Sequence, residues 1–131
     1  MARANSRLTY ADHATALRPL VESAELSDLM VRGWESRDTL TGAELYRFDI
    51  AMLNLLQAVE QAFVDHRDGK YPSDLMNVHF NSVPAFLNTP GGTSWWTDKK
   101  VWFSESFRQE VDNLIASPIP EARLAGPHID I

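Results

Sequence analysis

The feature that most constrains the fold of this chain is a long run, residues 41–68, in which apolar side chains recur every three or four positions. The recurring residues are Leu45, Phe48, Met52, Leu55, Val59 and Phe63. This spacing places them on one face of an α-helix. Four more apolar residues widen the stripe: Ile50, Leu53, Leu56 and Ala62. A helix that is apolar over so much of its circumference needs neighbours on at least two sides, so we expect it, over about 42–68, at the centre of an all-α fold.

Both ends of this run carry helix-terminating signals. Thr41-Gly-Ala-Glu44 has the spacing of a capping box, in which the threonine and glutamate side chains bond free backbone N–H groups of the first turn. At the other end Gly69 follows Asp68 and can adopt the left-handed conformation in which many helices end.

Shorter helical segments surround the long run. We expect them at 9–21 with an interruption at Pro19, at 24–31 with a stop at Gly33, at 73–87 with Ser73 as cap and Pro84 inside, and at 104–115 with Ser104 as cap. In the third segment the expected inward residues are Leu75, Val78, Phe80, Val83, Phe86 and Leu87. No segment alternates as a strand does. The sequence therefore predicts a compact bundle of about five helices in a single domain, 1–117, followed by an extended or loosely ordered tail, 118–131.

Composition argues against several classes of function. A formal net charge of −6 and a pI near 5.1 argue against nucleic-acid binding, which needs a basic surface to displace phosphate counterions. The absence of cysteine excludes disulfides and thiolate metal sites. No apolar stretch approaches the roughly 20 residues of a membrane span, and the first residues lack the apolar core of a secretory signal. We expect a cytoplasmic protein, or a membrane-proximal domain if an anchor was removed.

The ionisable residues show no catalytic pattern. His13 and His66 each follow an aspartate, but adjacent residues on a helix point in different directions. No zinc-protease, nucleophile-elbow or phosphate-loop motif is present. His79 is expected as a core or interface histidine. Three acidic residues of the long run are expected along its solvated edge: Glu44, Asp49 and Glu60. We therefore expect no catalytic residue, no metal and no cofactor.

The segment 88–104, "NTPGGTSWWTDKKVWFS", holds three of the four tryptophans and admits two interpretations. In the structural one, Pro90-Gly-Gly92 makes a turn and Thr93 or Ser94 caps a short helix. Trp95 and Trp102, and likewise Trp96 and Phe103, are seven positions apart and would form two neighbouring stripes on that helix. Aromatic stripes at helical spacing are usually core, so the structural interpretation is favoured.

The second interpretation is a binding site. Free amides at the helix start, together with Lys99 or Lys100, would hold an anion while the indoles stack on a ring. The candidate ligand or interface residues are Trp95, Trp96, Lys99, His66 and Arg67. Whether any indole faces solvent decides between the two interpretations, and we expect that most do not.

Two stretches resemble a bacterial family of small helical domains of uncharacterised function. They are "LTGAELYRFDIAMLNLLQAVEQAFVDHRDG" and "FLNTPGGTSWWTDKKVWFSESFRQEVDNLI", which together span about Leu40–Ile115. The shared signature is Pro-Gly-Gly, a tryptophan pair, and Phe-Arg before an aliphatic end. The resemblance implies a helical domain that in many members follows a transmembrane helix; we expect no such helix in this sequence. It implies no catalytic residue.

Two hypotheses of function follow. The first is a non-enzymatic helical domain that binds a protein partner or associates with itself, in a regulatory or sensory accessory role. The alternative is a small-molecule-binding domain, or an unrecognised enzyme, with a pocket beside the Trp95–Phe103 helix.

Overall fold

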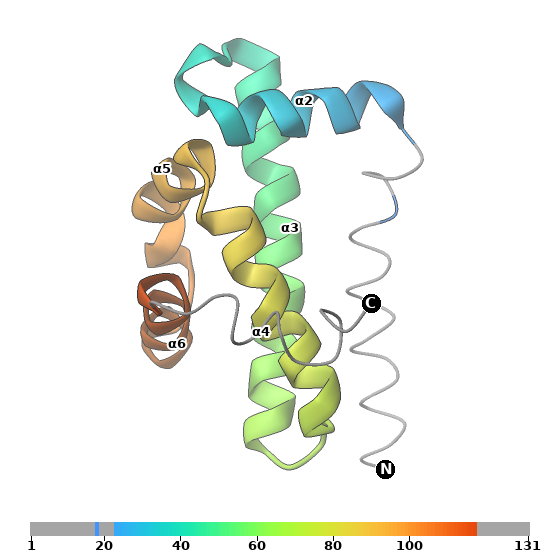
Figure 1. The fold of residues 1–131 in the computed structure, drawn as a ribbon, viewed down its shortest axis with the longest axis vertical. Coiled ribbons are helices and arrows are strands. Elements are labelled where there is room, and N and C mark those ends of the chain that lie inside the picture. Colours follow the sequence, from blue (N-terminus) through green and yellow to red (C-terminus); the bar gives the residue numbers. More distant parts are fainter. Residues whose placement is uncertain (1–17, 19–22, 118–131) are drawn as a thin grey trace.

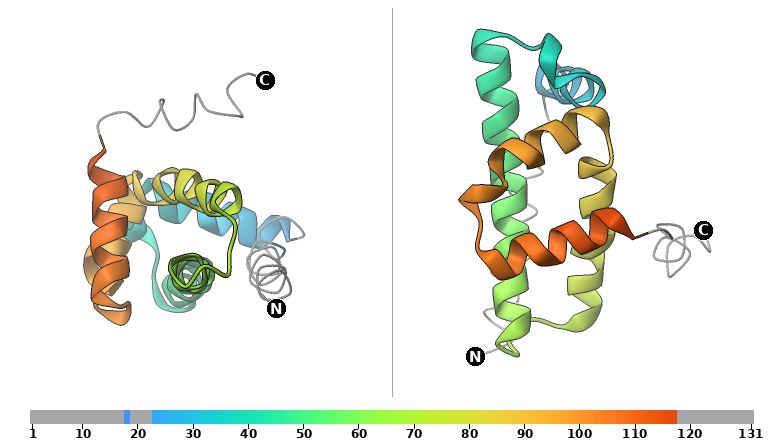
Figure 2. Two further views of the ribbon diagram at one scale, coloured as in Figure 1. Left: turned by 90° about the horizontal axis from the view of Figure 1, so that it is seen from below. Right: turned by 90° about the vertical axis from the view of Figure 1, so that its left-hand side faces the viewer.

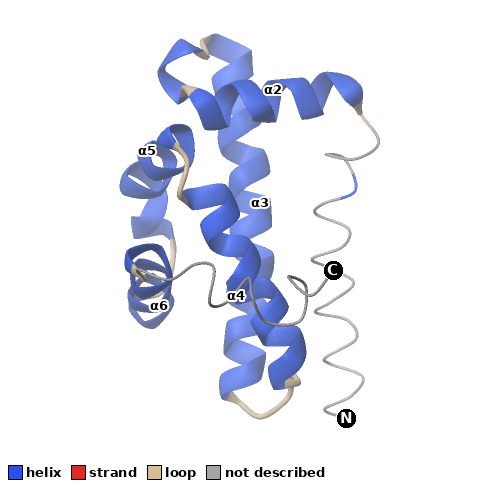
Figure 3. Cartoon of the chain, in the orientation of Figure 1, coloured by secondary structure: helices blue, strands red, loops and turns tan. Residues whose placement is uncertain are grey.

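A computed structural model of the chain describes Arg18 and residues 23–117. Within these residues the elements are α2 (Ala24–Glu35), η1 (Arg37–Thr39), α3 (Gly42–Arg67), α4 (Ser73–Leu87), α5 (Pro90–Lys99), η2 (Lys100–Trp102) and α6 (Glu105–Ala116), where η denotes a 3-10 helix. The described part contains helices and loops only (Figure 3). The all-α prediction is confirmed. The helix expected near 9–21 (apart from Arg18) and the tail expected at 118–131 lie outside the described residues.

The long helix organises the bundle. Figure 1 shows α3 along the long axis, with α2 crossing one end and α4 returning beside it. In the right-hand view of Figure 2, α5 and α6 lie across the pair formed by α3 and α4. Helix α4 contacts α3, α5 and α6, and α2 contacts both α3 and α5. This arrangement gives α3 the neighbours that its wide apolar stripe predicts.

The core lies between α3 and the helices around it. Four of the predicted inward residues of α3 are fully buried: Phe48, Met52, Leu55 and Val59. Leu56 and Ala62 are buried as well, so the stripe is wider than one face, as predicted. Ile50 is the exception because its side chain is exposed, and Leu53 is only half-buried. One strip of α3 therefore presents apolar side chains to the surface.

The two ends of α3 differ from each other in how well the sequence predicts them. Thr41 is the N-cap, but its side chain makes no capping bond, and the Glu44 carboxylate accepts from Arg32 Nη2 at 2.9 Å instead. The predicted capping box is therefore wrong. Gly69 has a φ of +76°, and Lys70 N donates to Asp65 O at 2.7 Å. The glycine-terminated end is confirmed.

Glycine does not stop α2, contrary to the prediction. The helix continues through Gly33 to Glu35. A Cβ at Gly33 would collide with the Phe48 ring, and a Cβ at Gly91 would collide with the Gly33 carbonyl oxygen. Glycine is thus required where α2 approaches α3 and α5, not where α2 ends.

Helix α4 is continuous. Pro84 lies inside it without dividing it, and the helix runs to Leu87, while Pro72 stands at the N-cap position in place of Ser73. Val78 was expected inward but its side chain is 50% exposed, whereas His79 is buried in the core. His79 Nε2 lies 2.7 Å from the Tyr71 hydroxyl oxygen, which fits the expected core histidine.

Candidate functional site

Helix α5 begins earlier than the sequence predicts. Thr89 is its N-cap and accepts a hydrogen bond from Gly92 N at 2.9 Å, and Pro90 occupies the first turn. The expected turn at 90–92 is therefore wrong, as is a cap at Thr93 or Ser94. Proline suits the first turn because its missing N–H group has no partner there in any helix. The earlier start adds a turn to α5 and fixes the positions of its tryptophans.

The aromatic residues of this region divide into buried and exposed ones. Trp95, Trp96 and Phe103 are buried, as predicted, and Trp95 Nε1 donates to the Asp49 carbonyl oxygen at 3.3 Å. Trp102 is 64% exposed, so the predicted Trp95–Trp102 stripe is wrong. The reason is that α5 ends at Lys99 and the chain continues as the tighter 3-10 turn η2, which directs Trp102 out of the core while Phe103, just after the turn, packs against Trp96.

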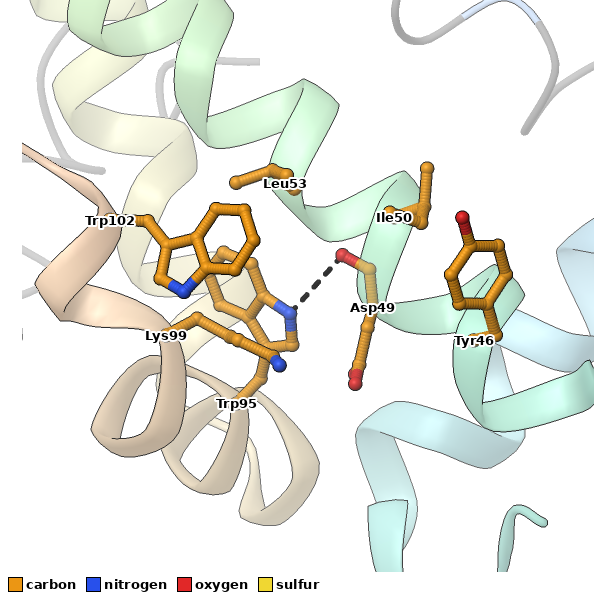
Figure 4. A pocket seen from close by; sticks show the side chains of 7 residues that line it. All are labelled: Tyr46, Asp49, Ile50, Leu53, Trp95, Lys99 and Trp102. Atoms are coloured by element: carbon orange, nitrogen blue, oxygen red, sulfur yellow. Dashed lines mark hydrogen bonds between the residues drawn. The ribbon is translucent and has the colours of Figure 1, made fainter. Parts of the chain in front are cut away.

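The exposed indole forms one wall of a groove between α3 and α5. Figure 4 shows the groove, and we call it the α3–α5 groove; it is lined by Tyr46, Asp49, Ile50, Leu53, Trp95, Lys99 and Trp102. Helix α3 supplies the first four of these, α5 supplies the next two and η2 supplies Trp102. Its volume is about 140 Å³. An engineered cavity of about 150 Å³ in another protein holds a benzene molecule, so the groove has the size of one aromatic ring.

An exposed apolar surface surrounds the α3–α5 groove. Three of the six exposed large apolar residues in the described part line the groove: Tyr46, Ile50 and Trp102. Tyr46, Ile50 and Leu53 are spaced as one stripe along α3. We call Tyr46, Ile50, Leu53 and Trp102 the apolar face. The other three exposed large apolar residues of the described part are Val31 on α2, Val78 on α4 and Val101 on η2, and none of them lines the groove.

A charged cluster holds α5 in place beside α3. Arg37 on η1 donates to both carboxylate oxygens of Asp49, at 3.0 and 2.8 Å, and to Asp98 Oδ2 at 3.0 Å. Its third partner is Ser94 Oγ at 3.3 Å. The hydrogen bond from Arg37 lowers the pKa of Asp98, and the one to Asp49 raises the pKa of Arg37. Three separate elements are thus tied together at the edge of the groove.

Lys99 lies at the mouth of the groove. Its Nζ is 5.9 Å from the centre of the Trp102 ring and 3.6 Å from Asp98 Oδ2. Figure 4 shows its side chain in front of the Trp95 indole. Asp49 also lines the groove, but its carboxylate is engaged by Arg37. Lys99 is therefore the lining residue whose charge is best placed to meet a bound group.

A second ion pair fixes α6 against α5 and η2. Asp112 accepts from Trp96 Nε1 at 2.8 Å and from Lys100 Nζ at 3.0 Å. Burial opposes ionisation of this carboxyl, but the indole and Lys100 outweigh it and lower the pKa of Asp112. Trp96 and Lys100 thus hold the bundle together, and neither lines the groove.

The structure does not bring all five candidate ligand or interface residues of the sequence analysis together in the groove. Trp95 and Lys99 line the groove, whereas Trp96 is buried behind it. His66 and Arg67 are at the far end of α3, where His66 Nε2 lies 3.1 Å from Ser73 Oγ and Arg67 bonds Ser106 Oγ. Thirteen residues of helix, or about 20 Å, separate His66 from Leu53.

Sequence reasoning also missed groove residues. The sequence predicts no role for Tyr46, a core position for Ile50 and Leu53, and the solvated edge for Asp49. The three carboxylates of α3 assigned to that edge all have partners: besides Asp49 and Glu44, the Glu60 carboxylate accepts from Ser104 N at 2.8 Å. The sequence signal that could have revealed the groove is the width of the apolar stripe on α3. The helices that pack against α3 do not cover the whole stripe, and its uncovered part lines the groove.

The described residues contain neither a metal-binding cluster nor a membrane-spanning helix. No group of three or more histidine, aspartate or glutamate side chains among them is arranged to hold a metal ion. None of the helices in this part of the chain has both the length and the apolar character needed to cross a membrane.

Comparison of the chain with protein-family models, with curated proteins and with solved structures found no match. The resemblance to the family of bacterial helical domains therefore stays a prediction.

Proposed function

We propose that this chain is a non-enzymatic binding domain that receives another protein on its apolar face, in a regulatory or sensory accessory role in the cytoplasm. The observation that carries the proposal is the gathering of exposed apolar side chains around one groove. Tyr46 is 69% exposed and Trp102 is 64% exposed, on two elements that face each other across it. Large apolar side chains gathered in this way are typical of binding surfaces.

The composition of the apolar face also favours a protein partner. Tyrosine and tryptophan are enriched where protein interfaces bind most tightly, because each buries a large area with few rotatable bonds. Behind the face, Trp95 is fully buried and hydrogen-bonded to α3, and Arg37 fixes α5 to the same helix. The apolar face therefore rests on a rigid support, which reduces the entropy lost when a partner binds.

Binding, as opposed to catalysis, fits the ionisable groups of the groove. The two that line it are Asp49 and Lys99. The carboxylate of Asp49 is bound on both oxygens by Arg37 and is not available as a base. A single lysine without a second reactive group supports recognition of a charge more readily than a reaction.

Capture experiments with surface variants test this function. Immobilised wild-type chain, Ile50→Asp and Val78→Asp would be incubated with a lysate of the source organism, and the retained proteins compared quantitatively. Both substitutions place a charge on an exposed valine or isoleucine, but only Ile50 belongs to the apolar face. We expect one protein retained by the wild type and Val78→Asp and lost with Ile50→Asp. Equal retention by all three, together with a strict monomer in light scattering, would contradict the proposal.

A small aromatic molecule is the second candidate for the groove, because its volume of about 140 Å³ matches one ring. A thermal-shift screen distinguishes the two, since a ligand at one hundred times its dissociation constant stabilises the fold by about 2.7 kcal/mol. A shift with a metabolite that Ile50→Asp removes would favour this candidate over a protein partner.

A further inference from the structure

We infer that the α3–α5 groove receives one aromatic side chain of a partner protein, and that a carboxylate next to that side chain pairs with Lys99. The inference rests on the proposed function, because it specifies which chemistry of a partner the apolar face recognises. Three observations carry it: the size of the groove, the charges around Lys99, and the absence of a suitable aromatic residue elsewhere on the described surface.

The size and walls of the groove select an aromatic ring. A volume of about 140 Å³ holds a single ring but not the whole side of a helix. Ile50 and Leu53 line the groove from α3 and Trp102 lines it from η2; Figure 4 draws Ile50 and Trp102 on opposite sides, with Leu53 between them. A ring inserted there can stack on the exposed indole of Trp102, a contact worth more than its buried area alone.

The charges around Lys99 select an anion. Lys99 Nζ is 3.6 Å from Asp98, a longer separation than the 3.0 Å between Asp98 and Arg37 Nη2. If Lys99 turned to a carboxylate on a partner, Asp98 would keep Arg37 as its partner. The new ion pair would therefore leave no charge unpaired within the cluster. It would also be partly shielded from water, because the Lys99 side chain is 29% exposed before any partner covers it.

A second copy of this chain is a poor source of the aromatic anchor. The exposed large aromatic residues of the described part are Tyr46 and Trp102, and both already line the groove. Inserting either one into a second copy would remove a wall from the groove that supplies it. The formal charge of −6 on each copy would add repulsion. A different protein is therefore the expected partner.

Model peptides test this inference on the full chain. Three acetylated and amidated hexapeptides would carry Asp-Phe, Lys-Phe or Asp-Ala at their centre, flanked by alanine. Nitrogen-15 NMR of the indole N–H groups would report binding at Trp102 and Trp95. We expect the Asp-Phe peptide to shift both signals at millimolar concentration, the Lys-Phe peptide to bind at least fivefold more weakly, and the Asp-Ala peptide not to bind.

Two lysine variants distinguish the effect of the Lys99 charge on binding from an effect on the fold. Lys99→Met keeps an unbranched side chain of similar size but removes the ammonium group. Lys100→Met removes the same charge one residue away, where Lys100 pairs with Asp112 outside the groove. We expect the preference for Asp-Phe over Lys-Phe to fall below twofold in Lys99→Met and to persist in Lys100→Met. Trp102 is exposed, so Trp102→Ala should leave the fold intact and weaken binding of the Asp-Phe peptide at least fivefold.

Several results would overturn the inference. They are equal affinity of the wild type for Asp-Phe and Lys-Phe, no indole shift with either, or loss of the preference in both lysine variants. Phenylacetate binding as tightly as the Asp-Phe peptide would assign the groove to a small aromatic acid, and a dimer abolished by Trp102→Ala would assign it to a second copy. If the peptides fail while Ile50→Asp still loses a captured protein, the anchor is wrong and the proposed function stands.

Discussion

At the scale of single residues, Arg37 connects parts of the chain that are far apart in sequence. It binds Asp49, twelve positions away, and Asp98, sixty-one positions away. No periodic pattern marks such a residue, because its partners lie on different elements and come together only when the bundle forms. Sequence reasoning placed Asp49 at a solvated edge for the same reason. Long-range ion pairs of this kind can be found only from the packed structure.

Removing Arg37 should destabilise the fold. Its side chain is 12% exposed and that of Asp49 is 14% exposed, so Arg37→Met leaves a largely buried carboxylate without its partner. Loss of one member of a fully buried pair costs about 3–5 kcal/mol, and partial exposure reduces this to about 1–3 kcal/mol. Urea unfolding measures the change. The control is Arg47→Met, which removes an exposed pair with Glu25 and should cost less than about 0.5 kcal/mol.

Ionised Asp98 should stabilise the fold, and this stabilisation should be lost at acid pH. Arg37 lowers the pKa of Asp98 in the folded state, so its contribution is present above the unfolded pKa of about 3.9 and is lost as pH falls through the lower folded value. The difference in unfolding free energy between wild type and Asp98→Asn should be largest above about pH 5 and should shrink below pH 4. Urea titrations across this range measure it. A constant difference from pH 7 to pH 3 would contradict the assignment.

Glycine at 91 should be required for packing. Alanine normally stabilises a helix relative to glycine by about 1 kcal/mol. At position 91, however, a Cβ would meet the carbonyl oxygen of Gly33, which is backbone and cannot move independently of α2. We expect Gly91→Ala to lower the unfolding free energy by about 1–3 kcal/mol, the usual cost of overpacking. Thr97→Ala, at an exposed position on the same helix, is the control. Stabilisation by Gly91→Ala would show that α2 and α5 are not in close contact.

At the scale of elements, the long helix was predictable and α5 was only partly so. A sustained apolar period fixes a helix such as α3 whatever surrounds it, because burial of the stripe dominates its stability. Helix α5 depends on tertiary packing instead. Gly91 and Gly92 were interpreted as a turn, but both are buried within the first helical turn, where side chains would collide with α2 and with the end of α4.

Thr89 should set the start of α5. Its hydroxyl accepts from Gly92 N at 2.9 Å, so Thr89→Ala leaves that donor without its cap and should cost about 1 kcal/mol. Thermal and urea unfolding measure the loss. Thr89→Ser keeps the hydroxyl oxygen and should recover most of it. If Thr89→Ala were neutral, the cap would not contribute, and a start of the helix at Thr93 or Ser94 would become the better description.

The groove shows where prediction from sequence reaches its limit. The apolar stripe on α3 indicated more apolar surface than one neighbour covers, but not which strip would stay uncovered. That depends on the end of α5 at Lys99, where η2 turns Trp102 outward to face Ile50 and Leu53. The functional hypothesis therefore changes from the buried tryptophans to the exposed one. His66 and Arg67 lie elsewhere because the length of α3 separates them from the groove.

At the scale of the whole molecule, the five α-helices of the described residues enclose one core, and an aromatic groove is open between α3 and α5. The rigid support behind the groove and the exposed rings at its edges are the two properties that a binding surface needs. The central claim is that a protein partner contacts the α3–α5 groove and not another part of the surface.

Site-specific photo-crosslinking tests that claim most directly. p-Benzoylphenylalanine would replace Tyr46 at the edge of the groove in one variant and the exposed Val78 on α4 in another. Both variants would be irradiated in cells of the source organism. We predict a discrete crosslinked protein from position 46, absent from position 78 and removed when Trp102→Ala is added. The same product from both positions, or none from position 46, would contradict the assignment of this groove as the binding surface.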